Sequence, residues 1–172
     1  MYNSLELIEL LKKEKYEIKV YHHDALFTVE DSKKLRGEID GAHSKNLFLK
    51  NKKNEFFLIS CEEADKIDLK KISKSLNMGN VSFAKEEYLD KYLKIKPGSV
   101  SPFALLNDKE GDVSFYLEKT LYESKFINFH PLINTLTITI KTYEFIEFMI
   151  ENNIKIHIFS SATGKVLKTY GK

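Results

Sequence analysis

The order of strand-like and helix-like segments is the feature that most constrains how this chain can fold. Apolar and polar residues alternate at 136–140, the pattern of a half-buried strand, and again at 154–158. Apolar spacings of three and four residues predict helices from 3 to 13 and from 142 to 149. Two apolar strands at 47–49 and 56–59 flank a polar turn, which predicts a hairpin. Helices therefore occur among hairpins instead of following every strand in turn.

This order predicts an α+β domain, or mixed α/β, in which helices pack on a mixed, largely antiparallel sheet. Further strands are expected at 18–22, 81–83, 103–106 and 113–117, and further helices at 28–36, 69–76 and 86–93. Asn3, Asp68 and Thr142 are expected to cap helices. All 172 residues, 1–172, are expected to form one domain, with 160–172 as a loose polar tail.

Composition excludes several classes of protein. The chain is 42% hydrophobic and 30% charged, as in folded globular domains. No apolar run is long enough to cross a membrane, and residues 1–6 lack the features of a signal peptide. The single cysteine, Cys61, cannot form an internal disulfide, which favours the cytoplasm. The net charge of +2 argues against a general nucleic-acid coat, so neither DNA nor a membrane is an expected partner, although a local patch is enough for RNA.

The familiar catalytic motifs are absent from the sequence, including the nucleophile elbow, the P-loop and the dinucleotide-binding glycines. His22 and His23 are adjacent on a strand and point to opposite faces, so they do not form a metal site with Asp24 or His43. Neither a metal nor a cofactor is expected. Cys61 is interpreted as a buried structural thiol, because no neighbour in sequence clearly activates it.

Three short segments place polar residues, glycine, proline or histidine next to expected apolar strands, where these residue types are unusual. The segment 41–46 places Lys45 and Asn46 just before an apolar strand, where a lysine can be directed into a cleft; a solvated lysine is the alternative. The loop 97–102 combines glycine with two prolines, which allows close approach to a ligand; a plain connector is the alternative. The segment 128–131 fixes His130 ahead of a strand, and a structural histidine is the alternative.

Together with Phe27-Thr28-Val29-Glu30, these three segments resemble the prolyl-tRNA editing domain family, also called the YbaK or INS-like superfamily. The resemblance is strongest to its freestanding bacterial members, the alanyl-tRNA(Pro) deacylases, and it covers roughly residues 5–155. Two departures are Ser44 and Ser101, which stand where many members have threonine. The segment 36–40 also lacks a proline that is often found there.

The resemblance implies a hydrolase that removes wrongly attached alanine from tRNA(Pro), with Lys45 as the catalytic residue and electrostatic clamp. The implied substrate-binding residues are Asn46, Gly98, Ser99, Val100, Ser101, Pro102, His130, Phe27 and Thr28. His130 is expected to line the amino-acid pocket, and Phe27 or Tyr21 to stack on the tRNA 3′ end. The expected partners are mischarged tRNA(Pro) and, transiently, prolyl-tRNA synthetase. Two alternatives stay open: editing of another mischarged tRNA such as Cys-tRNA(Pro), and a non-catalytic tRNA-binding or regulatory domain of this fold.

RNA phosphates would be contacted by lysines, because Arg36 is the only arginine. Three groups are candidates for this contact: Lys12, Lys13 and Lys15; Lys33, Lys34 and Arg36; and Lys50, Lys52 and Lys53. Solvated surface lysine is the alternative for each group.

Overall fold

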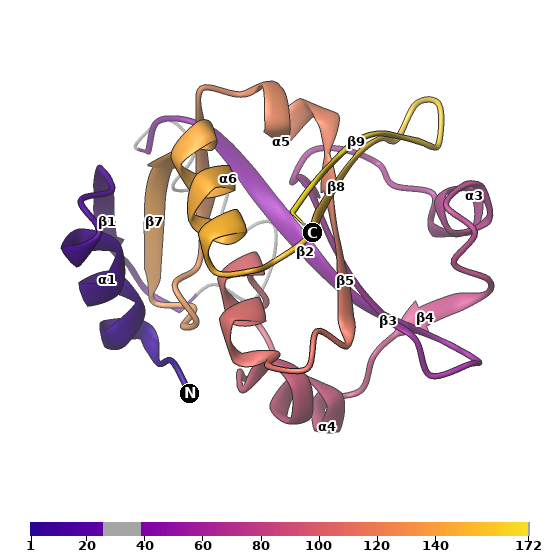
Figure 1. The fold of residues 1–172 in the computed structure, drawn as a ribbon, viewed down its shortest axis with the longest axis horizontal. Helices are drawn as coiled ribbons and strands as arrows, with labels where there is room; N and C mark the ends of the chain where they lie inside the picture. The colour runs from indigo at the N-terminus through magenta and orange to yellow at the C-terminus, as the bar shows by residue number, and fades with distance from the viewer. Residues whose placement is uncertain (26–38, 172) are drawn as a thin grey trace.

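The computed structural model describes residues 1–25 and 39–171 (Figure 1). The elements along the chain are α1 (Ser4–Lys13), β1 (Ile18–His22), β2 (Ala42–Asn51), β3 (Phe56–Glu62), α3 (Leu69–Ser75), β4 (Val81–Phe83), α4 (Glu86–Tyr88), the π-helix η1 (Leu89–Leu93), the 3-10 helix η2 (Pro102–Asn107), β5 (Val113–Glu118), α5 (Lys119–Glu123), β6 (Phe126–Phe129), β7 (Leu136–Lys141), α6 (Thr142–Glu151), β8 (Ile156–Ser160) and β9 (Lys165–Tyr170). The expected helix at 28–36 lies outside the described residues.

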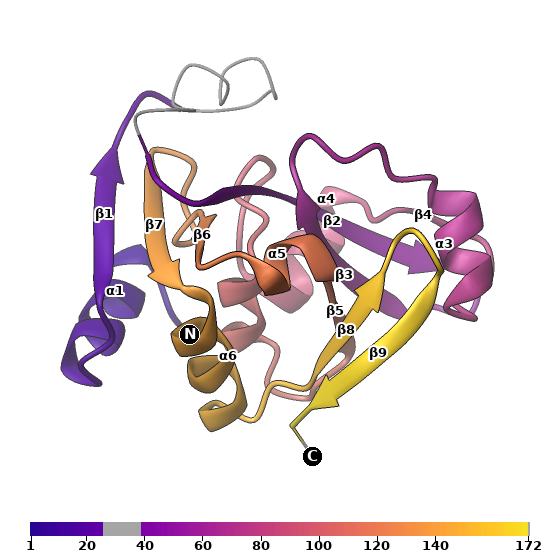
Figure 2. The same ribbon diagram turned by 90° about the horizontal axis from the view of Figure 1, so that it is seen from above.

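The strands form one nine-stranded sheet in the order β1-β7-β6-β2-β3-β5-β8-β9, with β4 paired to β2. The pairs β2–β6, β3–β5 and β5–β8 are parallel and the remaining pairs are antiparallel. Helix α1 lies at one edge of the molecule and α3 at the opposite edge (Figures 1 and 2). The predicted α+β class, with a mixed and largely antiparallel sheet, is confirmed.

Side-chain alternation along β2 divides the core into two clusters on opposite faces of the sheet. Phe48 packs in the larger cluster with Phe145 and Phe148 of α6, which defines the α6 face. Leu49 packs in the smaller cluster with Ile72 of α3, which defines the α3 face. Each position along β2 can therefore be assigned to one of these two faces.

Several local predictions are confirmed. Asn3 and Glu6 form a capping box at the start of α1, and the Asp68 side chain accepts the N–H of Lys71. The hairpin is also present, because β2 and β3 pair antiparallel around a polar turn. These features depend on neighbours in sequence, which explains why the sequence reveals them.

The strand expected at 103–106 is wrong, because these residues form the 3-10 helix η2. Pro102 occupies the first helical turn, where its fixed φ suits a helix and its missing N–H costs nothing. Ser101 caps the helix by accepting the N–H of Phe103 at 3.4 Å. Apolar residues at 103–106 are buried on every side, so a run of apolar residues did not distinguish helix from strand.

Three other expectations need correction. The prediction of a loose tail is wrong, because residues 165–170 form β9, which pairs antiparallel with β8. The hydroxyl oxygens of Tyr170 and Tyr122 lie 2.7 Å apart, so a hydrogen bond holds the end of this strand. Thr142 does not cap α6; its hydroxyl donates to the carbonyl of Ser124 and Lys141 occupies the N-cap. The strand at 136–140 is buried on both faces, since only 6% of Thr137 and 4% of Thr139 are exposed.

Phe103 provides a test of how η2 is held in the core. Its ring is fully buried and contacts Phe129, Phe145 and Phe148 edge to face at centroid distances of 5.9, 5.6 and 5.9 Å. Phe103→Ala should lower the free energy of unfolding by about 3–5 kcal/mol, measured by urea denaturation. The control Tyr143→Ala, which removes a ring that is 64% exposed, should change it by less than about 0.5 kcal/mol. Similar effects of both substitutions would contradict this role.

Candidate active site

Strand β2 changes partners along one of its edges. That edge pairs with β6 at Ala42 and His43 and with β4 at residues 49–51, while the other edge pairs with β3 from 44 to 50. Within the part of the chain that the structure describes, residues 44–48 have no strand partner on the first edge. Lys45 and Asn46 lie in this interval, so the sheet itself opens a gap at the predicted site.

Lys45 lies on the α3 face, and its ammonium group is held by backbone atoms. The ammonium Nζ donates to the carbonyl of Glu63 at 3.5 Å and to the carbonyl of Asp65. An ammonium has three N–H donors and no lone pair, so one donor remains for a ligand. The arrangement fixes a positively charged donor that is suited to stabilising a developing negative charge.

His130 directly follows β6, the strand that pairs with the start of β2. The last residue pair of the two strands is His43 with Asn128, two residues before Lys45 and His130 respectively. The His130 ring nitrogen Nδ1 lies 2.8 Å from the carbonyl oxygen of Leu136, which can only accept, so Nδ1 carries the proton. Burial lowers the pKa of His130, and the Leu136 carbonyl and the Glu63 charge oppose this shift.

His23, which the sequence analysis did not include in the site, stands beside His130. The two rings are 5.9 Å apart, and Nε2 of His23 lies 2.9 Å from the hydroxyl of Thr137. Its proximity adds to the lowering of the His130 pKa, because a second positive charge there would be unfavourable.

Asn46 lies on the α6 face, opposite to Lys45. Its Oδ1 accepts from the Ser60 hydroxyl at 2.6 Å, and its Nδ2 donates to the Ser44 hydroxyl at 3.4 Å. Ser44 in turn donates to the carbonyl of Asn128 at 2.8 Å. The structure therefore places Asn46 in a network that joins β2, β3 and β6, and it does not bring the Asn46 and Lys45 side chains together.

The loop 98–102 packs against the larger core cluster, on the α6 face. Gly98 is exposed with a φ of +84°, a conformation that favours glycine, whereas Ser99 and Ser101 are buried. Pro102 is buried and Val100 packs against the larger core cluster. Just after the loop, the ring contact between Phe103 and Phe129 connects it to the residue that precedes His130. Among the described residues, no hydrogen bond joins this loop to Lys45.

The remaining predicted residues have different outcomes. Phe27 and Thr28 lie outside the described residues. Cys61 is buried beside Lys45, and burial raises the pKa of its thiol to about 12, which agrees with a structural thiol. In residues 1–25 and 39–171, no three His, Cys, Asp or Glu side chains are grouped as metal ligands, and no helix is long and apolar enough to span a bilayer.

Sequence reasoning missed two features that organise the gap. The acidic residues Glu62, Glu63 and Asp65 at the end of β3 and just after it gave a visible signal. The carbonyls of Glu63 and Asp65 accept from the Lys45 ammonium, and the charge of Lys45 opposes the burial that raises the pKa of the Asp65 carboxyl. Asn128 was part of a recognised motif without an assigned role. Its Nδ2 donates to the carbonyls of Asp40 and Ala42 at 2.9 and 3.2 Å, which fixes the start of β2.

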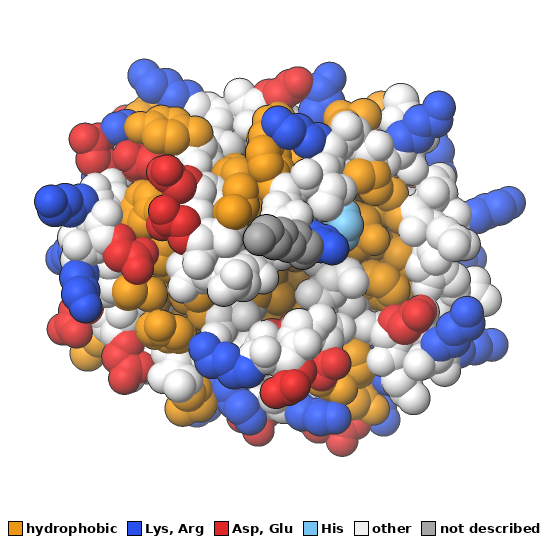
Figure 3. Space-filling model, in the orientation of Figure 1, with side chains coloured by type: hydrophobic (Ala, Val, Ile, Leu, Met, Phe, Trp, Pro, Cys, Tyr) orange, Lys and Arg blue, Asp and Glu red, His pale blue; other side chains and the backbone are white. Residues whose placement is uncertain are grey.

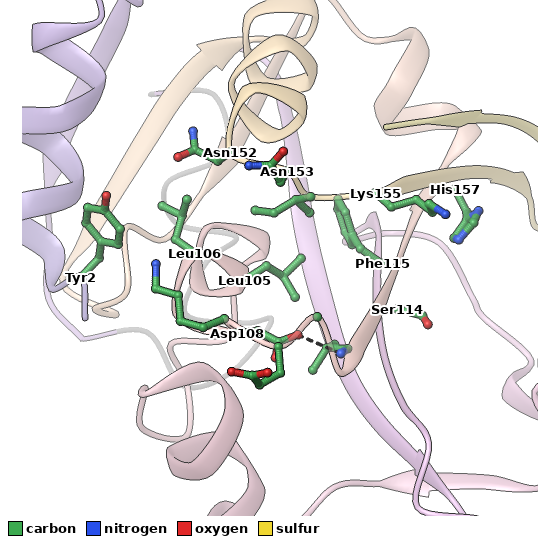
Figure 4. Close-up of a pocket in the computed structure, with 15 residues that line it drawn as sticks. Tyr2, Leu105, Leu106, Asp108, Ser114, Phe115, Asn152, Asn153, Lys155 and His157 are labelled. Carbon is green, nitrogen blue, oxygen red and sulfur yellow. Dashed lines mark hydrogen bonds between the residues drawn. The ribbon is translucent and has the colours of Figure 1, made fainter. Parts of the chain in front are cut away.

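A cleft of about 730 Å³ lies elsewhere, between the turn after η2 and the turn after α6 (Figure 4). Its wall includes Asp108, Lys155 and His157 but none of the predicted site residues. The Asp108 carboxylate accepts the N–H groups of Asp112 and Val113 at 3.2 and 2.8 Å, so it stabilises the turn. The cleft is therefore separate from the gap beside β2 in which Lys45 lies.

The lowered pKa of His130 has a consequence for stability. As the pH falls below about 6.5, the unfolded chain binds a proton at this position that the folded chain does not. The stabilisation that His130 provides is thus complete above this pH and is lost as the pH approaches the lower pKa of the folded state. We expect the destabilisation caused by His130→Gln to shrink between about pH 7.5 and about pH 5, measured by urea unfolding. A difference that does not vary with pH, or an equal trend in the exposed control His22→Gln, would contradict this assignment.

Comparisons with known proteins identify the family to which the whole domain is similar. Residues 23–148 match the model of the aminoacyl-tRNA editing domain. The prolyl-tRNA editing protein ProX of Acetoanaerobium sticklandii is 33% identical over 148 residues, which covers 86% of this chain and 90% of that protein. The prolyl-tRNA synthetase associated domain-containing protein 1 of Xenopus laevis is 37% identical over 132 residues, or 74% of this chain and 78% of that protein.

The fold also matches a solved structure. A crystal structure provisionally described as a trans-editing enzyme for prolyl tRNA synthetase superposes with a TM-score of 0.66 at 16% identity, covering 91% of this chain and 96% of that one. At this identity the likeness shows the fold alone. The family match and the identity to ProX show more: the chain belongs to the aminoacyl-tRNA editing domain family, a family of hydrolases, as its sequence motifs predicted.

Proposed function

We propose that this protein deacylates mischarged Ala-tRNA(Pro) and releases alanine and free tRNA. The observation that carries the proposal is the Lys45 ammonium, held by two backbone carbonyls in the gap where β2 has left β6. The names of the relatives, which refer to prolyl-tRNA editing and to prolyl-tRNA synthetase, support the choice of tRNA(Pro).

The reaction requires water to attack the ester carbonyl between the amino acid and the terminal ribose. Negative charge then develops on the carbonyl oxygen, and a preorganised donor that faces this charge is usually the largest catalytic contribution. Lys45 supplies such a donor as a charged clamp, because its ammonium is already held before substrate arrives. The N–H groups of the 98–102 loop would hold the ester and the amino acid beside it.

Selectivity for alanine follows from the limits of a synthetase pocket. A pocket built for proline rejects smaller alanine poorly, because missing methylenes change binding by only about 1–3 kcal/mol. An editing pocket can instead exclude proline by steric overlap. His130 is suited to form its wall, because Nδ1 bonds to the Leu136 carbonyl and burial holds the ring in place. A transient contact with prolyl-tRNA synthetase and a cytoplasmic location belong to the same proposal.

The first test replaces the proposed clamp. Lys45→Ala should reduce single-turnover deacylation of Ala-tRNA(Pro) by at least about 100-fold, the usual effect of removing one such donor. Lys155→Ala, which removes an exposed lysine from the cleft of Figure 4, is the matched control and should retain the parental rate. Parental activity in Lys45→Ala would exclude the clamp. Absence of activity in the parent on Ala-tRNA(Pro), with turnover of Cys-tRNA(Pro) or of neither, would support one of the two alternative functions.

The second test separates the exclusion of proline by the amino-acid pocket from the chemical step. It compares the deacylation rates for Ala-tRNA(Pro) and Pro-tRNA(Pro). His130→Ala should enlarge the pocket and lower the ratio of the two rates by about tenfold, which corresponds to about 1.4 kcal/mol of lost discrimination. Gly98→Ala adds a methyl group where φ is +84°, so it should displace the loop and slow both substrates together. An unchanged ratio in His130→Ala would show that His130 does not form the pocket wall that excludes proline.

A further inference from the structure

We propose that helix α3 and the adjacent strand β4 form the surface that binds the acceptor end of the tRNA. The inference rests on the proposed function and identifies where its substrate lies. We define the α3 surface by the exposed residues Lys66, Lys70, Lys71, Lys74 and Phe83. None of these residues was selected from the sequence as an RNA contact.

The first argument is charge. Helix α3 buries Ile72 against the sheet and packs Leu69 and Leu76 beside it, so the lysines between them point to solvent. The segment 66–75 contains four exposed lysines and one acid, Asp68, whose carboxylate is engaged by the N–H of Lys71. A compact group of exposed lysines is the feature that neutralises RNA phosphates.

The second argument is position relative to the catalytic lysine. Leu47 and Leu49 of β2 pack against the α3 cluster, and Lys45 lies on the same face by alternation. The carbonyl of Asp65 accepts from the Lys45 ammonium, and only four residues separate Asp65 from Lys70. Five extended residues span at most about 18 Å, so α3 begins close to the reacting ester.

The third argument is an exposed aromatic ring on this face. Phe83 of β4 pairs with Leu49, so it lies on the α3 face, and 64% of it is exposed. Strand spacings place its Cα about 14 Å from that of Lys45. This is roughly the rise of four stacked nucleotides. An exposed ring beside lysines is the usual platform for unpaired bases, and the tRNA 3′ end is unpaired.

Of the lysine groups that the sequence suggested as RNA contacts, those in the described residues lie farther from the Lys45 face than the α3 surface does, or on the opposite face of the sheet. Lys12 and Lys13 lie on α1, at the edge opposite to α3, and Tyr16 beside them is surrounded by the charges of Glu14, Glu147 and Glu151. Acidic side chains gather over this side of the molecule (Figure 3). Lys50 stacks over Tyr88 at 5.2 Å on the α6 face, opposite to Lys45. The group at 33–36 lies outside the described residues.

The test measures binding of uncharged tRNA(Pro) by fluorescence anisotropy over a range of salt concentrations. The triple variant Lys70→Gln, Lys71→Gln, Lys74→Gln should raise Kd on the order of tenfold at low salt and reduce the salt slope by about 2. The charge-matched variant Lys12→Gln, Lys13→Gln, Lys15→Gln, at the end of α1 and just after it, should bind like the parent. Equal effects of the two variants, or no effect of the α3 variant, would overturn the proposal.

A second measurement tests the stacking platform separately. Phe83→Ala should weaken binding of tRNA(Pro) several-fold but should leave unchanged the binding of a tRNA that lacks its unpaired 3′ end. Tyr143→Ala removes an equally exposed ring on α6 and should affect neither RNA. A loss for both RNAs, or for neither, would overturn the role of Phe83. These binding measurements do not require hydrolysis, so α3-dependent binding in a protein that leaves Ala-tRNA(Pro) intact would reject the proposed function and retain this surface.

Discussion

The divergence of β2 from β6 is the constraint on which the rest of the site depends. Parallel pairing holds these strands together at Ala42 and His43, and the Asn128 side chain reinforces it by donating to the carbonyls of Asp40 and Ala42. Beyond this point β2 continues along β3 alone until it meets β4. A central strand that loses one neighbour leaves backbone N–H and C=O groups without a strand partner in the middle of the sheet. These groups and the side chains beside them can then line a cleft that the sheet itself forms, without a contribution from loops.

Alternation along β2 then assigns separate tasks to neighbouring residues. Lys45 reaches the α3 face and is held by carbonyls from the segment after β3, whereas Asn46 reaches the α6 face and bonds to Ser44 and Ser60. The charged group is thereby kept on the opposite side of β2 from the larger apolar cluster, where an unpaired charge would be costly. One strand thus carries both the Lys45 ammonium and the polar network that joins β2 to β3 and β6.

The sequence revealed what depends on short-range patterns and missed what depends on distant partners. The capping box at Asn3 and the hairpin of β2 and β3 were predictable because turn and cap chemistry is local. Strand β9 was not, because its exposed residues, apolar Val166 and Leu167 among them, show no alternation and become a strand only through pairing with β8. Lys45 could be singled out by its motif. That Lys45 and Asn46 point to opposite faces of the sheet could be assigned only from the observed strand pairing. The backbone carbonyls that hold Lys45 could be identified only from the path of the chain after β3.

The two faces of the sheet also differ in which side-chain substitutions they can accommodate. On the α6 face, Phe103, Phe129, Phe145 and Phe148 interlock, so a change in volume is resisted by several rings at once. On the α3 face, the apolar cluster is smaller, and Lys45 lies on the same side of β2 by alternation. Substitutions there change charge and contacts more than packing, because less apolar area is at stake. A substitution on the α3 face therefore leaves in place the larger apolar cluster, which holds most of the buried apolar residues of the domain.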